Sequence, residues 1–160
     1  MNKLLKIFLT VLLVIITTTA FAQEATVVEK SQIAEGVTLK HSYTPGEMGS
    51  FDTLIINVDG KDVEIFNSEG RKIKEVIPVD GDSDGKLEYI VSMDCGGSGG
   101  FYDVVLIKAK GDVWTVAWED SFANPKLQLN KDNNTVFLVI EHIVIENDTP
   151  TKKVTKISLS

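Results

Sequence analysis

A short acidic stretch between two apolar runs limits the folds open to this chain. Asp80, Asp82 and Asp84 stand at alternate positions, and Gly85 follows directly. Aspartate and glycine disfavour strand and helix interiors, so this stretch is predicted to be a loop. The flanking runs, residues 73–79 and 87–93, are rich in β-formers and predict strands. The chain must therefore accommodate a tight acidic loop between two β-strands.

Three carboxylates this close together repel one another unless a positive charge lies between them. Ca²⁺ takes about six to eight oxygen ligands, which carboxylates and backbone carbonyls supply. With Asp80 as position one, Asp82 and Asp84 occupy positions three and five. Position seven offers the Lys86 carbonyl, and position nine offers the Glu88 carboxylate, either directly or through a water. We therefore predict a calcium site of strand–loop–strand type. The alternative is an acidic turn that holds no metal.

The pattern Asp-x-Asp-x-Asp-Gly, followed by an acid and an apolar strand, resembles the calcium loops of FG-GAP/VCBS repeats, the units of integrin α-subunit propellers. The resemblance covers residues 72–118, a single repeat. It implies a calcium ion held by Asp80, Asp82, Asp84, the Lys86 carbonyl and Glu88. The family's Phe-Gly-Gly-Ala-Pro segment is absent, and residues 96–101 read Gly-Gly-Ser-Gly-Gly-Phe.

The start of the chain has the organisation of an export signal. Lys3 and Lys6 precede an apolar run over residues 7–16, and a small-residue cleavage site ends at Ala22. The apolar run is short for a membrane span. We predict a signal peptide over residues 1–22 and a single β domain over residues 23–160. The domain is expected to be periplasmic or secreted, without stable membrane insertion after cleavage; an uncleaved anchor is the alternative.

The net charge and the cysteine content exclude several kinds of partner and cross-link. Loss of the predicted signal removes two lysines and takes the net charge from −7 to −9. Nucleic acids and anionic membranes are bound through basic patches, so we expect neither as a partner. The single cysteine, Cys95, excludes an intrachain disulfide and is predicted to be a small buried residue.

Two turn signals predict hairpins. Asp59-Gly60 fits a type I′ turn, which pairs Ile56 with Val63 and Leu54 with Ile65. Gly111-Asp112 fits a type II′ turn. That turn predicts three pairs on one face: Ala109 with Trp114, Ile107 with Val116, and Val105 with Trp118. Both tryptophans are then expected to anchor the core.

The remaining pattern predicts the fold class. Residues 24–35 fit either a short helix or a first strand, and residues 87–93, apolar on both faces, predict a central strand. Residues 121–125 predict a loop. About eight to ten short strands indicate an all-β protein. We expect an antiparallel sandwich or open barrel, or alternatively partial propeller-like sheets, built around one calcium-binding hairpin loop.

These features predict an exported, non-catalytic calcium-binding domain. Ca²⁺ would clamp the loop over residues 80–88 in a structural or protein-interaction role, with a protein or glycan as the possible partner. An enzyme is not predicted, because no nucleophile–base pair, zinc spacing or cofactor fingerprint is visible.

A second resemblance gives an alternative function. Residues 98–102, Ser-Gly-Gly-Phe-Tyr, are similar to the Ser-Gly-x-x-Tyr motif of small periplasmic lysozyme inhibitors. The resemblance implies that Ser98 and Tyr102 enter a lysozyme cleft.

Overall fold

The computed structural model describes residues 26–34, 36–45 and 50–159, so the predicted signal peptide lies outside the described residues. The described part of the chain forms ten β-strands and no helix. They are β1 (Val27–Ala34), β2 (Val37–Tyr43), β3 (Ser50–Val58), β4 (Lys61–Asn67), β5 (Lys72–Val79), β6 (Glu88–Asp94), β7 (Phe101–Lys110), β8 (Val113–Asp132), β9 (Thr135–Glu146) and β10 (Thr149–Ser158). The all-β prediction is confirmed, and the ambiguous segment forms a strand over its described residues 27–34. The described residues therefore include no helix able to span a membrane.

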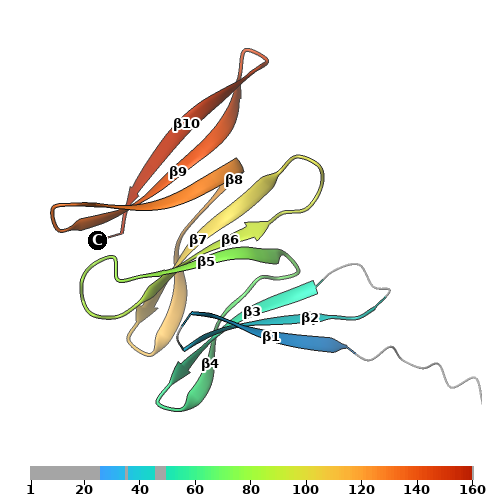
Figure 1. Ribbon diagram of the computed structural model, residues 1–160, viewed down its shortest axis with the longest axis vertical. Coiled ribbons are helices and arrows are strands. Elements are labelled where there is room, and N and C mark those ends of the chain that lie inside the picture. Colours follow the sequence, from blue (N-terminus) through green and yellow to red (C-terminus); the bar gives the residue numbers. More distant parts are fainter. Residues whose placement is uncertain (1–25, 35, 46–49, 160) are drawn as a thin grey trace, which may run out of the picture.

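The strands form two antiparallel sheets (Figure 1). Sheet A has the order β1-β2-β3-β4, and sheet B has the order β10-β9-β8-β7-β6-β5. Within each sheet, strands that are consecutive in sequence pair with one another, because short turns connect antiparallel strands directly; the chain passes from sheet A to sheet B between β4 and β5. Neither sheet closes into a barrel, which is consistent with the sandwich expected from the sequence.

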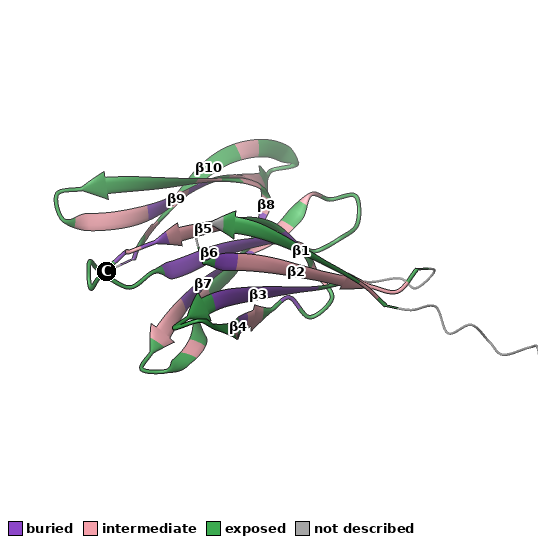
Figure 2. Cartoon of the chain, turned by 60° about the horizontal axis from the view of Figure 1, so that its bottom comes forward, coloured by how far each residue is buried: buried purple, intermediate pink, exposed green. Residues whose placement is uncertain are grey.

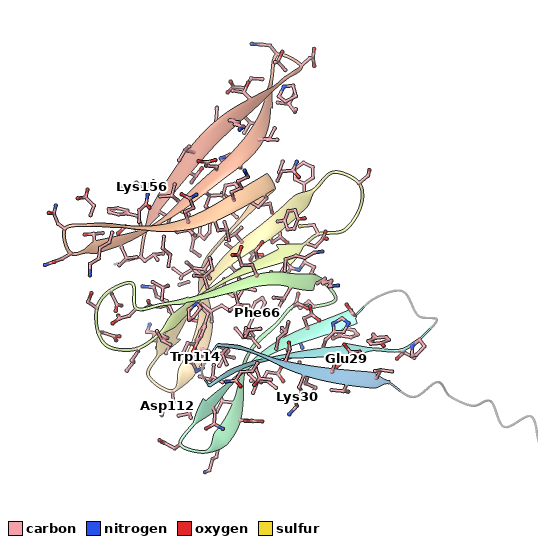
Figure 3. The ribbon with its side chains drawn as sticks, viewed as in Figure 1. Glu29, Lys30, Phe66, Asp112, Trp114 and Lys156 are labelled. Atoms are coloured by element: carbon pink, nitrogen blue, oxygen red, sulfur yellow. The ribbon has the colours of Figure 1, made fainter. Side chains whose placement is uncertain are left out.

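A first core lies between the two sheets. Val37, Leu54 and Ile56 of sheet A pack in one cluster with Tyr89, Val91, Met93, Val105 and Ile107 of sheet B. Phe66 and Trp114, both labelled in Figure 3, are partly buried against this cluster. The alternating apolar residues of β2 and β3 therefore face sheet B.

A second core lies on the opposite face of β6 and β7. Ile90, Val104 and Leu106 project to this side, where Phe122, Leu138, Ile140 and Leu159 cover them. Residues 88–93 of β6 are consequently all buried, as Figure 2 shows by colour. The prediction of a central strand over residues 87–93 is confirmed, although Leu87 lies outside the strand and is exposed.

The first hairpin follows its turn signal only near the turn. Ile56 pairs with Val63 as predicted, but Leu54 pairs with Phe66 rather than with Ile65. Ile65 is an extra residue in β4, because the register shifts between Leu54 and Ile55. The shift lets Ile65 and Phe66 both contact the first core.

The second hairpin shows the same departure. Ala109 pairs with Trp114 and Ile107 pairs with Val116, as predicted. Trp118 pairs with Leu106 rather than with Val105, because the register shifts between Leu106 and Ile107. One extra residue in a strand reverses the face of every side chain beyond it. Trp114 therefore packs on the first core and Trp118 on the second.

The predicted loop over residues 121–125 is wrong. β8 continues through it and exchanges its partner β7 for β9 at Ala123. A register shift between Ala123 and Lys126 leaves Asn124 and Pro125 outside the ladder, and Asn124 has a φ of 48°. Proline is tolerated at such a bulge because it needs no ladder hydrogen bond. The bulge bends β8, which brings β9 and β10 over the second core.

Candidate functional site

The acidic loop, residues 80–88, connects β5 to β6. The antiparallel pair Val79–Glu88 closes it. Ser83 and Gly85 have φ angles of 63° and 85°, so the backbone turns through the left-handed region twice. Glycine adopts this conformation without steric cost, which explains Gly85 after the third aspartate. The predicted irregular loop between two strands is confirmed.

The loop brings the three predicted aspartates together. Each of Asp80, Asp82 and Asp84 offers one carboxylate oxygen, and these three atoms lie within 4.8 Å of one another. Asp80 is half-buried, whereas Asp82 and Asp84 are exposed. The side chains therefore converge on one point at the surface.

Backbone amides of the loop hold the carboxylates in place. The Asp84 N–H donates to Asp82 Oδ1 at 3.2 Å, and the Gly85 N–H donates to Asp80 Oδ2 at 3.2 Å. The Lys86 N–H donates to Asp84 Oδ1 at 2.8 Å. The other oxygen of Asp80, Oδ1, is a buried side-chain atom of the described residues that has no hydrogen-bond partner. An unpaired buried carboxylate oxygen is costly, so this atom requires explanation.

Glu88 lies apart from the aspartate group. Its side chain is almost fully buried, and Oε2 accepts a hydrogen bond of 2.6 Å from the Gly81 N–H. Burial raises the pKa of Glu88 above its ordinary value, and the charges of Asp82 and Asp80 raise it further. The Gly81 hydrogen bond and the Lys108 charge act in the opposite direction. Glu88 therefore braces the loop backbone at Gly81, and its carboxylate is also a predicted ligand.

Lys108 is a site residue that the sequence analysis missed. Its Nζ atom donates to the Leu159 carbonyl at 2.7 Å and lies 3.8 Å from both Asp82 Oδ2 and Glu88 Oε1. A tethered ammonium therefore borders the acidic loop. No local motif pointed to it, because Lys108 lies on β7 and reaches the loop across β6.

The C-terminal segment also contacts the loop. A Cβ atom at Gly81 would lie 2.6 Å from Leu159 Cβ, closer than any side chain tolerates. Leu159 is itself buried in the second core, and its N–H donates to the Val136 carbonyl at 3.0 Å. Gly81 thus allows the backbone of the loop to pack directly against the end of the chain.

The residues of the lysozyme-inhibitor resemblance lie at the other end of sheet B. Ser98 is exposed in the turn before β7, and Tyr102 is half-buried opposite Phe122. The adjacent Phe101 is the more exposed aromatic, at 52%. These residues are separate from the acidic loop, and their predicted role stays a prediction.

Cys95 is exposed, so its predicted burial is wrong. The residue follows the last position of β6 and enters the glycine-rich turn, where little covers it. Partial desolvation raises the pKa of the thiol, and the hydrogen bond and negative charge of Asp103 raise it further. The thiol is consequently a poor nucleophile at neutral pH.

Comparison with protein-family models, with curated proteins and with solved structures finds no match for this chain.

Proposed function

We propose that this protein is an exported, non-catalytic domain that binds Ca²⁺ in the acidic loop. Asp80, Asp82 and Asp84 supply side-chain oxygens, and the Lys86 carbonyl is a further ligand. Glu88, which lies outside the aspartate group, contributes directly or through a bound water. The ion braces the connection between β5 and β6, in a structural role or to support contact with a partner. Export rests on the signal-like residues 1–22 and stays part of the proposal.

The observation that carries the proposal is the convergence of three carboxylates, one of which has a buried oxygen without a hydrogen-bond partner. Calcium–oxygen distances are about 2.3–2.6 Å, so two ligands of one ion lie at most about 5 Å apart. The 4.8 Å spread of the three aspartate oxygens meets this limit. If Asp80 binds the cation through Oδ1, that buried atom gains the partner that it lacks.

Lys108 offers a competing explanation for the same cluster. Its ammonium neutralises part of the negative charge from 3.8 Å without any metal. It does not remove the need for a cation at Asp80, because its contacts are with Asp82, Glu88 and the Leu159 carbonyl. Calcium binding and the Lys108 contacts can therefore be separated by mutation.

The decisive experiment is calorimetric titration of the purified protein with Ca²⁺, together with thermal unfolding at the same calcium concentrations. A free Ca²⁺ concentration of about 100 times the dissociation constant stabilises the folded state by about 2.7 kcal/mol. The variant Asp82→Ala/Asp84→Ala is expected to lose both the binding heat and the calcium-dependent rise in Tm. The matched control, Asp112→Ala/Asp132→Ala, removes two exposed acids elsewhere and should retain both.

Replacement of Lys108 separates the two explanations. Lys108→Met removes the tethered charge, so we expect tighter Ca²⁺ binding than in the unmodified protein. If the loop instead depends on Lys108 alone, the variant will be destabilised and Ca²⁺ will not rescue it. Absence of binding heat in the unmodified protein and in Lys108→Met would end the calcium proposal.

A further inference from the structure

The open edges of the two sheets differ in how they are protected. Exposed strand edges present unpaired N–H and C=O groups, and proteins usually protect them with charge, proline or bulges. β10 carries Pro150 and three lysines, and β5 carries Pro78 with three charged residues and a register shift. β4 carries Lys61, Asp62, Glu64 and the bulge at Ile65. Three of the four edges in the described structure are therefore guarded.

β1 is the exception among these edges. It has no proline and only two charged residues, Glu29 and Lys30, which cancel (Figure 3). Its one register shift lies at its end, between Gln32 and Ala34, so residues 27–32 pair regularly with β2. The strand is exposed over residues 28–33, as Figure 2 shows, and it includes Val28 at 50% and Ile33 at 39% exposure.

Charge favours a second copy of this chain as the occupant of the edge. The chain has a net charge of −7, so contact between two copies is opposed least at a surface that carries no net charge. β1 carries no net charge, whereas the net charge is −1 on β4, +1 on β5 and +3 on β10. Antiparallel pairing of one edge with its own copy is two-fold symmetric, and it closes both open edges without leading to a polymer.

The sequence of β1 also limits the register of such a pair. A strand that pairs with its own copy places one residue opposite itself at the two-fold axis. Axes at Glu29 or Lys30 would oppose like charges, which is destabilising. Axes at Val28 or Ser31 avoid this, and the Val28 axis also covers the most exposed apolar side chain of the strand.

We propose that β1 is a self-association edge, through which two copies join their A sheets into one continuous antiparallel sheet. The partner is a second copy of this chain, and the axis lies at Val28 or Ser31. The interface consists mainly of backbone hydrogen bonds from one strand per copy, so the dimer is reversible and depends on concentration. The inference does not depend on calcium.

Analytical ultracentrifugation over a concentration series tests this proposal. The unmodified protein is expected to shift from monomer to dimer as concentration rises, with slower amide hydrogen exchange in β1. Val28→Lys/Ser31→Lys places like charges at either axis, so the variant is expected to stay monomeric. Both positions are exposed, so the monomer should keep its near-UV spectrum and Tm.

Val154→Lys/Thr149→Lys makes the same charge change at exposed positions of the guarded edge β10. This control is expected to dimerise like the unmodified protein. Loss of the dimer in the control but not in the β1 variant would place the interface on β10 and overturn the proposal. A chain that stays monomeric at every soluble concentration would overturn it too, as would growth into larger polymers.

Discussion

At the scale of single residues, Asp52 is a buried carboxylate outside the acidic loop with partners in both sheets. It is 1% exposed on β3. Its Oδ1 atom contacts His41 Nδ1 within sheet A, and its Oδ2 atom accepts a 2.6 Å hydrogen bond from the Ile73 N–H of β5. One buried carboxylate therefore connects the two sheets. The same carboxylate gives His41 a hydrogen-bond partner within sheet A.

Asp52→Ala is expected to lower the free energy of unfolding by about 1–3 kcal/mol, because it leaves the buried Ile73 N–H without an acceptor. Urea denaturation measures the change. The control is Asp62→Ala, which removes an exposed pair with Lys30 at 3.8 Å and should cost about 0–1 kcal/mol. An equal loss of unfolding free energy in the two variants would mean that the contact of Asp52 with Ile73 does not stabilise the packing of the two sheets.

A second polar cluster, around Asp103, is expected to make the stability of the fold depend on pH in the acid range. Burial alone would raise the pKa of Asp103, but hydrogen bonds from Ser121, Arg71 and Cys95 outweigh it and leave the pKa below its ordinary value. The ionised carboxylate is thus favoured by the folded state. Its contribution to stability is present above the unfolded-state pKa and disappears as pH falls through the lower folded-state pKa.

Asp103→Asn is expected to reduce the loss of unfolding free energy as the pH falls. The unmodified protein should lose stability between about pH 5 and pH 2, and the variant should lose less over the same range. Urea unfolding at a series of pH values measures both curves. Ser98→Ala, in the exposed neighbouring turn, should retain the full acid dependence. An unchanged acid dependence in Asp103→Asn would contradict the assigned pKa direction.

At the scale of elements, the acidic loop depends on an exceptionally close contact. The loop backbone at Gly81 approaches Leu159, whose carbonyl accepts the Lys108 ammonium. Glu88 accepts a hydrogen bond from the Gly81 N–H. The loop is consequently coupled to β7 and to the end of the chain, and not only to the strands that it connects.

Gly81→Ala is expected to destabilise the fold by about 1–3 kcal/mol, because the added methyl group overlaps Leu159 and forces the segments apart. Thermal and urea unfolding in the presence of a calcium chelator measure this effect without the ion. Ser83→Ala, an exposed change in the same loop, should stay within about 0.5 kcal/mol of the unmodified protein. A Gly81→Ala variant as stable as this control would show that Leu159 moves aside at little cost in free energy.

At the scale of the whole molecule, two cores share one pair of strands. Tyr89 and Val91 of β6 face the first core, whereas Ile90 of the same strand faces the second. β7 alternates in the same way. Loss of either core would therefore expose one face of both central strands, so the two cores are expected to unfold together.

The two tryptophans test this coupling, since Trp114 lies against the first core and Trp118 against the second. Trp114→Ala and Trp118→Ala should each lower stability by about 1–3 kcal/mol. In each variant the remaining tryptophan reports on the opposite core by fluorescence. Its denaturant midpoint should coincide with the midpoint from far-UV circular dichroism. Separate midpoints would show that the cores unfold independently.

The all-β class, the acidic loop and the positions of both hairpin turns could all be predicted from local sequence. These features depend on short-range chemistry: aspartate and glycine in the loop, left-handed turn residues, and alternation with a period of two. The pairs nearest the turns, Ile56–Val63 and Ala109–Trp114, were therefore predictable.

Beyond the first few residues from a turn, tertiary packing determines which of the two cores a side chain faces. Bulges at Ile65 and after Ala123, and the shift before Trp118, depend on packing against distant strands. The same limit explains why Lys108 and Leu159 were missed at the acidic loop. Lys108 comes within reach of Asp82 because β7 pairs with β6, and Leu159 comes within reach of Gly81 because sheet B folds back across its own face. No local sequence pattern encodes either contact.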